Sequence, residues 1–293
     1  MHKYINIAIL SSFFCLWLNS YLTDKYELII GFLFIFSVGI FHGANDLMLI
    51  KNINISKNNY SFINILTYYL LIVTIGVLLF VFFPFFALFS FIIVSGYHFG
   101  EQQLQFLNKN KIFNFITNIV YGIFILLLLF NCHKIEVSQI IFEITNISIP
   151  ILVYSAALIG FSILLFLLFL YLYVYHSEMR TKIQLELFYL LVFSIIFLSS
   201  GLIWGFAIYF IIWHSIPSII DQVKFLHHEL TFKNFLKYFK SAFLYWIISL
   251  IGITALYFLF KDQKIFNALF FSFLAAITFP HVLVIIKMFE KSK

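Results

Sequence analysis

The sequence predicts an all-α integral membrane protein, a polytopic bundle of about ten transmembrane helices. Hydrophobic residues make up 63% of the 293 residues and charged residues only 10%, with a mean hydropathy of +1.04. Soluble domains carry roughly 25% charged residues, so this chain has too little polar surface to face water. We therefore expect lipid to be its solvent, and a single helical domain to cover residues 1–293.

The individual spans follow from the polar interruptions between apolar runs. A spanning helix needs about 20 mostly apolar residues. Ten segments come close to that length: 3–22, 27–50, 61–83, 85–107, 112–131, 151–176, 184–200, 202–226, 239–260 and 264–288. The mixed segment 132–150 is interpreted as an interfacial helix. The boundaries at Pro84 and at Ser199-Ser200-Gly201 fit either a tight turn between two spans or a kink in one.

Positive charge orients this arrangement in the membrane. With ten alternating spans, 14 of the 18 lysines and arginines fall on one side, and only Lys25, Lys134, Lys261 and Lys264 fall on the other. Loops rich in lysine and arginine stay in the cytoplasm, so both termini are predicted to be cytoplasmic and the protein to lie in the inner (cytoplasmic) membrane. Because the basic residues lie in short loops, the net charge of +6 does not indicate a nucleic-acid partner.

Four of the nine histidines lie inside four different apolar spans: His42, His98, His214 and His281. Ionisable residues at membrane depth are costly and usually face a bundle interior or a cavity. The four spans run in the same direction, and the rise of a helix places the histidines within roughly 7 Å of one another along the membrane normal. Convergent neutral imidazoles suit Zn, Cu, Fe or Ni. Four separate hydrogen-bonded core histidines are the alternative interpretation.

Acceptors for the second ring nitrogen of each histidine are also present. A ligating histidine normally donates its other N–H to such a group. Five polar residues lie one or two helical turns after three of the histidines: Asp46, Glu101, Gln102, Ser218 and Asp221. Polar groups gathered at bilayer depth need a partner or a function, so these residues are predicted to surround a metal centre.

Four short motifs carry the histidines: His42-Gly43-Ala44-Asn45-Asp46, Tyr97-His98-Phe99-Gly100, Trp213-His214-Ser215 and Pro280-His281. In type, order and spacing they resemble the Brp/Blh family of membrane β-carotene dioxygenases over nearly the whole chain. The resemblance implies oxygen-dependent cleavage of β-carotene at its central 15,15′ double bond, giving two molecules of all-trans-retinal. It also implies a non-haem Fe²⁺ held by histidines.

The resemblance carries His42, His98 and His214 over as iron ligands. Members of the family often have a second histidine four residues after the Trp-His-Ser histidine, but this chain has Ser218 there. We therefore expect His281 to complete the ligand set and Ser218 to orient a ligand or a water molecule.

The implied substrates are β-carotene and O₂, with the polyene entering sideways from the lipid. Tyr97 and Trp213 are candidates to grip it, although packing explains these two side chains equally well. Whether the retinal is supplied to a microbial rhodopsin stays open.

Two other functions remain as alternatives. A bis-histidine haem membrane protein usually places two histidines on each of two helices, whereas this chain has one in each span. A histidine-rich transporter or channel would also need ionisable residues at mid-membrane. It would be expected to show discontinuous helices or repeats, and the sequence indicates neither.

Overall fold

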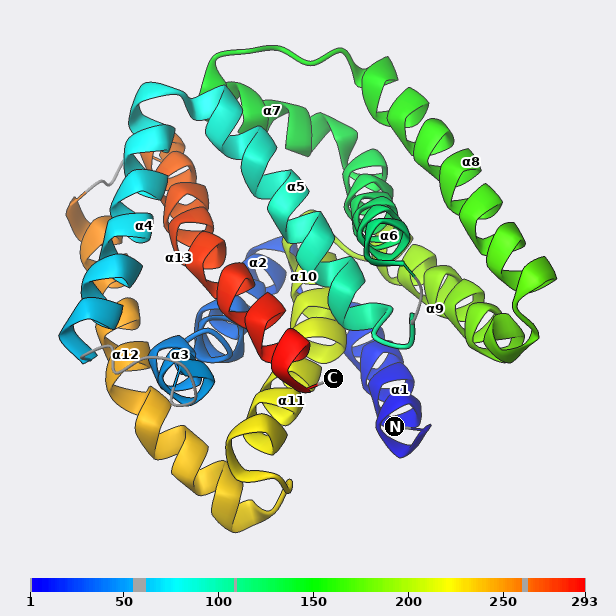
Figure 1. Ribbon diagram of the computed structural model, residues 1–293. Helices are drawn as coiled ribbons and strands as arrows, with labels where there is room; N and C mark the ends of the chain where they lie inside the picture. The colour runs from blue at the N-terminus through cyan, green and yellow to red at the C-terminus, as the bar shows by residue number, and fades with distance from the viewer. Residues whose placement is uncertain (1, 55–61, 108–109, 260–262, 293) are drawn as a thin grey trace. The chain divides into compact units, whose positions relative to one another are not determined.

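The structure, a computed structural model, describes residues 2–54, 62–107, 110–259 and 263–292 (Figure 1). Within these ranges the chain is helical, with no strand. Four residues that enter the charge argument lie outside them: Lys57, Lys109, Lys261 and Lys293. The orientation in the membrane therefore stays a prediction.

Seven helical segments among the described residues are long and apolar enough to cross a membrane: Ile63–Phe82, Lys111–Cys132, Ile151–Tyr175, Ser177–Leu198, Leu202–His227, Phe232–Ala255 and Phe270–Lys291. The protein is therefore a multi-pass membrane protein. The first apolar helix, Tyr4–Asn19, is shorter. The count of ten spans stays a prediction.

The chain folds into two compact units, each assembled from three separated stretches of sequence. Unit 1 contains Met1–Ile35, Ser95–Ile141 and Ser148–His214, and unit 2 contains Phe36–Val94, Phe142–Ile147 and Ser215–Lys293. The prediction of a single domain over residues 1–293 is not decided by this division.

Unit 1 is built around a group of long helices, of which α6, α8 and α9 pack side by side (Figure 1). Its helices, some of which cross the boundary between the units, are α1 (His2–Asn19), α2 (Asp24–Phe34), the second half of α5 (Pro84–Gln103), α6 (Lys111–Cys132), α7 (Lys134–Thr145), α8 (Ile151–Tyr175), the 3₁₀ turn η2 (Ser177–Met179), α9 (Arg180–Leu198), α10 (Leu202–Ile208) and the π-helix η3 (Tyr209–Ser215). α10 packs on α2 and α9, and α1 packs on α9.

Glycines bring α5 and α6 into backbone contact beside His98. A Cβ on Gly100 would lie 1.9 Å from the carbonyl oxygen of Asn118, and one on Gly122 would lie 1.8 Å from that of Gly96. No side chain fits in this space, so only glycine allows the crossing, in which two membrane helices approach closely. The crossing fixes the part of α5 between Gly96 and Gly100, where His98 lies.

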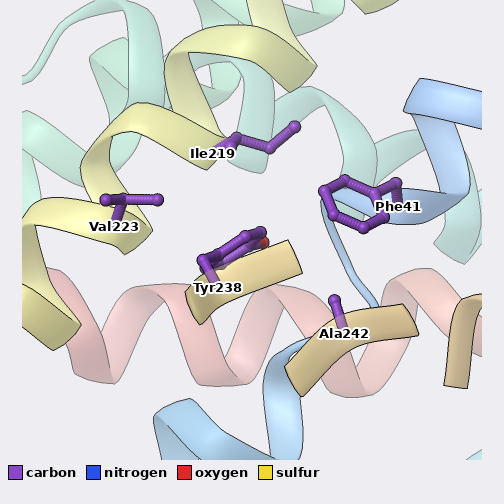
Figure 2. Packing of buried hydrophobic residues seen from close by; sticks show 5 residues of the cluster. All are labelled: Phe41, Ile219, Val223, Tyr238 and Ala242. Atoms are coloured by element: carbon purple, nitrogen blue, oxygen red, sulfur yellow. The ribbon is translucent and has the colours of Figure 1, made fainter. Parts of the chain in front are cut away.

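Unit 2 contains the remaining helices: the π-helix η1 (Ile35–Gly39), α3 (Asp46–Asn54), α4 (Phe62–Phe82), α11 (Ile216–His227), α12 (Phe232–Leu259) and α13 (Gln263–Ser292). α13 packs on α3, α4 and α12, and α11 packs on α12. A buried hydrophobic cluster joins α11, α12 and the segment before His42 (Figure 2): Phe41, Ile219, Val223, Tyr238 and Ala242. The rings of Phe41 and Tyr238 meet edge to face, 5.7 Å apart.

The predicted span 27–50 is wrong as one continuous helix. The chain forms α2, the π-helix η1, a turn over residues 42–45 and then α3. Within the turn the amide of Gly43 donates to Ile40 and that of Asp46 donates to Gly43. Two glycines and an asparagine stand in or beside this turn, and their poor helix propensity explains the break.

Both boundaries that the sequence left open separate two helices. α4 ends at Phe82 and α5 begins at Pro84, where the missing N–H of proline costs nothing in the first turn of a helix. α9 ends at Leu198 and α10 begins at Leu202. In addition, α12 begins at Phe232, seven residues before the predicted span 239–260, and segment 132–150 contains the short helix α7.

Candidate metal centre

Unit 1 holds one pair of buried histidines. His98 lies on α5 and His214 lies in η3, and each is 2% exposed. Their ring centroids are 4.7 Å apart and their planes nearly perpendicular, at 82°. Aromatic rings surround His214: Phe99 meets it edge to face at 4.7 Å, and Phe210 stacks on it at 5.5 Å. This pair is therefore enclosed by apolar aromatic side chains.

The backbone around His214 is a π-helix, which the sequence did not predict. A π-helix shifts each hydrogen bond by one residue, and such segments recur at functional sites. Two of its carbonyl groups accept hydrogen bonds from other helices: that of Ile212 from the Tyr4 hydroxyl, and that of His214 from the Gln102 amide at 3.1 Å. Side chains of α1 and α5 thus hold the segment that presents His214.

The other predicted site residues of unit 1 have partners of their own. Trp213 donates its indole N–H to Ser12 at 2.9 Å and packs against Phe193. Tyr97 donates to Glu101 at 2.8 Å. The amide nitrogen of Gln102 donates to the backbone carbonyl of His214, and its predicted role as an acceptor for His98 stays a prediction. Contact of Tyr97 or Trp213 with a substrate stays a prediction.

Unit 2 holds the second pair, with nearly the same ring geometry. The ring centroids of His42 and His281 are 4.8 Å apart, with an interplanar angle of 87°, and both residues are buried. The Nδ1 atom of His42 hydrogen-bonds the carbonyl of Gly39, and that of His281 hydrogen-bonds a carboxylate oxygen of Asp46 at 2.8 Å. Because a carbonyl and a carboxylate only accept, both Nδ1 atoms carry a proton, and in the neutral form of each ring the Nε2 atom carries the lone pair.

Asp46 contacts one of the four predicted histidines, but the prediction of its partner was wrong. It was expected to serve His42, four residues earlier on one helical face. The turn over residues 42–45 breaks that helical relation, and Asp46 binds His281 instead. Its second oxygen accepts a hydrogen bond from the Tyr69 hydroxyl at 3.0 Å, and the residue is 2% exposed. The carboxylate therefore has partners on both oxygens and fixes the imidazole of His281.

A chain of buried polar side chains holds the backbone at His42. Gln222 donates its amide hydrogens to the carbonyl of His42 at 2.8 Å and to Ser218 at 3.0 Å. Tyr238 donates its hydroxyl to the Gln222 amide oxygen at 2.8 Å, and Asn45 donates to the Tyr238 carbonyl at 3.0 Å. This network satisfies a carbonyl that the broken helix no longer pairs.

The sequence singled out Ser218, whose role toward a ligand or a water molecule stays a prediction, but not Gln222, Tyr238 or Asn45. A signal was available for two of these, because Asn45 and Gln222 are polar residues within predicted spans, where each needs a partner. The predicted site residue Asp221 lies half-buried on α11. Its role in a site stays a prediction.

The geometry within each pair fits two imidazoles on one cation. A metal–nitrogen distance of about 2.1 Å and a bond angle of about 90–110° would place the two ring centroids about 4.6–5.3 Å apart. The two observed separations, 4.7 and 4.8 Å, lie in that range. Edge-to-face contacts between aromatic rings also have centroid separations in this range. The protonated Nδ1 atoms of unit 2 therefore carry the stronger argument for a cation.

The break before α3 removes one argument against a transporter. Discontinuous helices are typical of transporters, and residues 42–45 interrupt one here. Helix continuity therefore does not separate the two functions.

The comparisons with known proteins favour one of them. Residues 33–289 match the model of the family described as Beta-carotene 15,15'-dioxygenase, and all four histidines lie within that range. No curated protein and no solved structure matches the chain significantly.

Proposed function

Because the chain belongs to the beta-carotene 15,15'-dioxygenase family, we propose that it cleaves β-carotene at the central 15,15′ double bond to two molecules of all-trans-retinal. Family membership indicates a carotene dioxygenase, and the apolar helices supply the lipid setting that such a substrate requires. In this reaction the C=C bond is replaced by two C=O bonds. Both oxygen atoms of O₂ enter the products, so no reductant is consumed.

The proposal includes an Fe²⁺ ion bound by His42, His98, His214 and His281. Bound iron with open positions would supply the activation of O₂ beside the alkene. The assignment of His281 follows from its hydrogen bond to Asp46, which is the arrangement that orients metal-binding histidines. In this scheme His281 takes the place of the second histidine that family members often have four residues after the Trp-His-Ser histidine, where this chain has Ser218. That the two pairs share one ion is part of the proposal.

The chain's own residues have three tasks in this scheme. Asp46 and the Gly39 carbonyl hold the rings of His281 and His42 with Nε2 as the donor atom. The carboxylate of Asp46 also offsets part of the positive charge that four neutral imidazoles leave on the ion. The aromatic rings around His98 and His214 keep water away, since an apolar wall offers it no hydrogen bonds.

The observation that carries the proposal is the match of residues 33–289 to the family model, and the hydrogen bonds that orient His42 and His281 support the metal-binding part of it. The test is expression in a host that produces β-carotene. We expect the pigment to bleach and two retinal molecules to appear for each carotene lost. His228→Ala, in an exposed turn, is the matched control and should behave like the wild type. Unchanged colour despite expression in the membrane would overturn the proposal, and aldehydes of unequal length would refute central cleavage.

We further propose that the protein lies in the inner membrane with both termini in the cytoplasm. The distribution of lysines and arginines over the predicted loops supports this orientation.

A further inference from the structure

The start of α12 bears a stripe of lysines. Lys233, Lys237 and Lys240 are spaced by four and three residues, which places them on one face of the helix, and all three are exposed. The buried residues Tyr238 and Ala242 lie on the opposite face and pack against α11 (Figure 2). The stripe therefore points away from the protein core.

Apolar side chains accompany these lysines. Leu230 is 48% exposed, Phe232 77% and Leu236 40%, all within the stretch where α11 ends and α12 begins. From Lys224 to Lys240 the sequence has four lysines and one acid, Glu229. Exposed leucine and phenylalanine beside lysine are typical of segments that lie at the boundary between acyl chains and headgroups.

The length of α12 places this stretch at that boundary. Its 28 residues rise about 42 Å, whereas the hydrocarbon core of a bilayer is about 30 Å thick. Roughly two turns must therefore stand in the headgroup layer. The lysines are in the first turns of the helix, so these are the turns that leave the hydrocarbon.

We propose that the first turns of α12 form a binding site for anionic phospholipids. The headgroup phosphate lies against Lys233, Lys237 and Lys240, and the exposed apolar side chains of Phe232 and Leu236 lie beside them in the same interfacial layer. A zwitterionic headgroup carries its own cation and binds this stripe more weakly. The choice of an anionic lipid follows from the excess of lysines over acids in this stretch.

Binding there stabilises the unit that contains His42 and His281. Lysines at i and i+4 repel one another and destabilise the helix that carries them, and an anionic headgroup removes that repulsion. The same helix carries Tyr238, which donates to Gln222, and Gln222 holds the carbonyl of His42. A ligand that binds only the folded state raises its stability by mass action.

The test compares phosphatidylglycerol with phosphatidylcholine on the purified full chain. In detergent, native mass spectrometry counts the lipids retained as each is titrated, and in nanodiscs of either lipid the unfolding temperature is measured. We expect tighter retention of phosphatidylglycerol and a higher unfolding temperature in its nanodiscs. Each Lys→Gln change in the stripe should weaken phosphatidylglycerol binding about fivefold.

The matched control removes the same charge elsewhere. Lys51, Lys111 and Lys182 are exposed and lie outside the stripe, so Lys51→Gln/Lys111→Gln/Lys182→Gln should bind phosphatidylglycerol like the wild type. Lys233→Gln/Lys237→Gln/Lys240→Gln should lose the preference. Equal retention of the two lipids by the wild type, or equal losses in both triple variants, would overturn the proposal. No step requires carotene cleavage, so the result is independent of the proposed enzymatic function.

Discussion

The two histidine pairs have almost the same ring geometry, yet their surroundings differ. In unit 1 the rings of Phe99 and Phe210 enclose His214. In unit 2 a carboxylate and a backbone carbonyl bind the ring nitrogens of His281 and His42. Ring packing therefore surrounds the imidazole of His214, whereas directed hydrogen bonds hold both imidazoles of the second pair. The pair in unit 1 should therefore be disturbed by substitutions that change side-chain volume, and the pair in unit 2 by substitutions that remove a hydrogen-bonding atom.

The backbone of each unit explains this difference. In unit 1, α5 remains helical through His98 and its place is set by contact with α6 at the glycines. In unit 2 the helix stops before His42, which leaves peptide groups that must be paired inside a membrane protein. Gln222 and Asn45 meet that need, so the polar network is a consequence of the broken helix.

The largest expected effect comes from removing one histidine of each pair. His98→Ala and His281→Ala should each reduce retinal formation to background and lower the iron content, because each deletes a proposed ligand. Retinal is measured by chromatography and iron by elemental analysis of purified protein, with His228→Ala as the control. Full activity in one variant would show that the pair in that unit is structural.

Gly100→Ala tests whether packing positions the pair of unit 1. Its methyl group would overlap the carbonyl oxygen of Asn118, so α5 and α6 must separate. Overpacking of this kind should cost about 3 kcal/mol, seen as a lower unfolding temperature. Gly160→Ala is the matched control, because a Cβ at Gly160 meets no atom within 4 Å, and it should be neutral or slightly stabilising. An unchanged unfolding temperature for Gly100→Ala would contradict the role of the crossing.

Asp46→Asn tests whether hydrogen bonds position the pair of unit 2. The amide keeps the shape but loses the charge, and an acceptor that orients a metal-binding histidine is typically worth about 10–100-fold in metal affinity. Competition with a chelator measures this loss. Asp24→Asn, at an exposed helix start, removes the same charge and should leave the affinity unchanged. Equal metal affinities in the two variants would show that Asp46 does not contribute to metal binding.

Tyr238→Phe should have the smallest effect. It removes the hydroxyl that binds Gln222 and leaves a buried amide oxygen with one donor fewer, at a cost of about 1 kcal/mol in the free energy of unfolding. Tyr245→Phe, further along α12, is the control, and chemical denaturation in detergent is the measurement. A loss no greater than in the control would show that the network does not depend on Tyr238.

Hydropathy predicted most of the fold because lipid imposes one simple rule on helix length. The segments 112–131 and 151–176 agree with α6 and α8 to within a residue at each end. The span 27–50 failed because the glycines and the asparagine near its middle were not weighed against its hydropathy, and because the π-helix before them has partners far away in sequence. The indole of Trp246, for example, donates to the carbonyl of Ser37 inside η1 at 2.9 Å, and no local pattern announces a donor more than 200 residues away.

The histidines were identifiable because a buried imidazole in an apolar span stands out from its neighbours. Their pairing was not, since an argument from depth along the membrane normal says nothing about which helices are neighbours. The error at Asp46 has the same origin. Spacing of four residues implies a shared face only while the helix continues, and here the chain turns between His42 and Asp46.

The interleaving of the two units has a consequence for synthesis. The last residue of unit 1 is His214, whereas unit 2 needs α13 with His281. As the ribosome extends the chain, unit 1 can therefore be assembled while α11, α12 and α13 are still to be translated. The contact between α5 and α6 beside His98 lies within this early part. The carboxylate of Asp46, in contrast, can bind His281 only after 235 further residues have been translated. A premature stop anywhere before α13 would leave Asp46 in the membrane without the imidazole it binds.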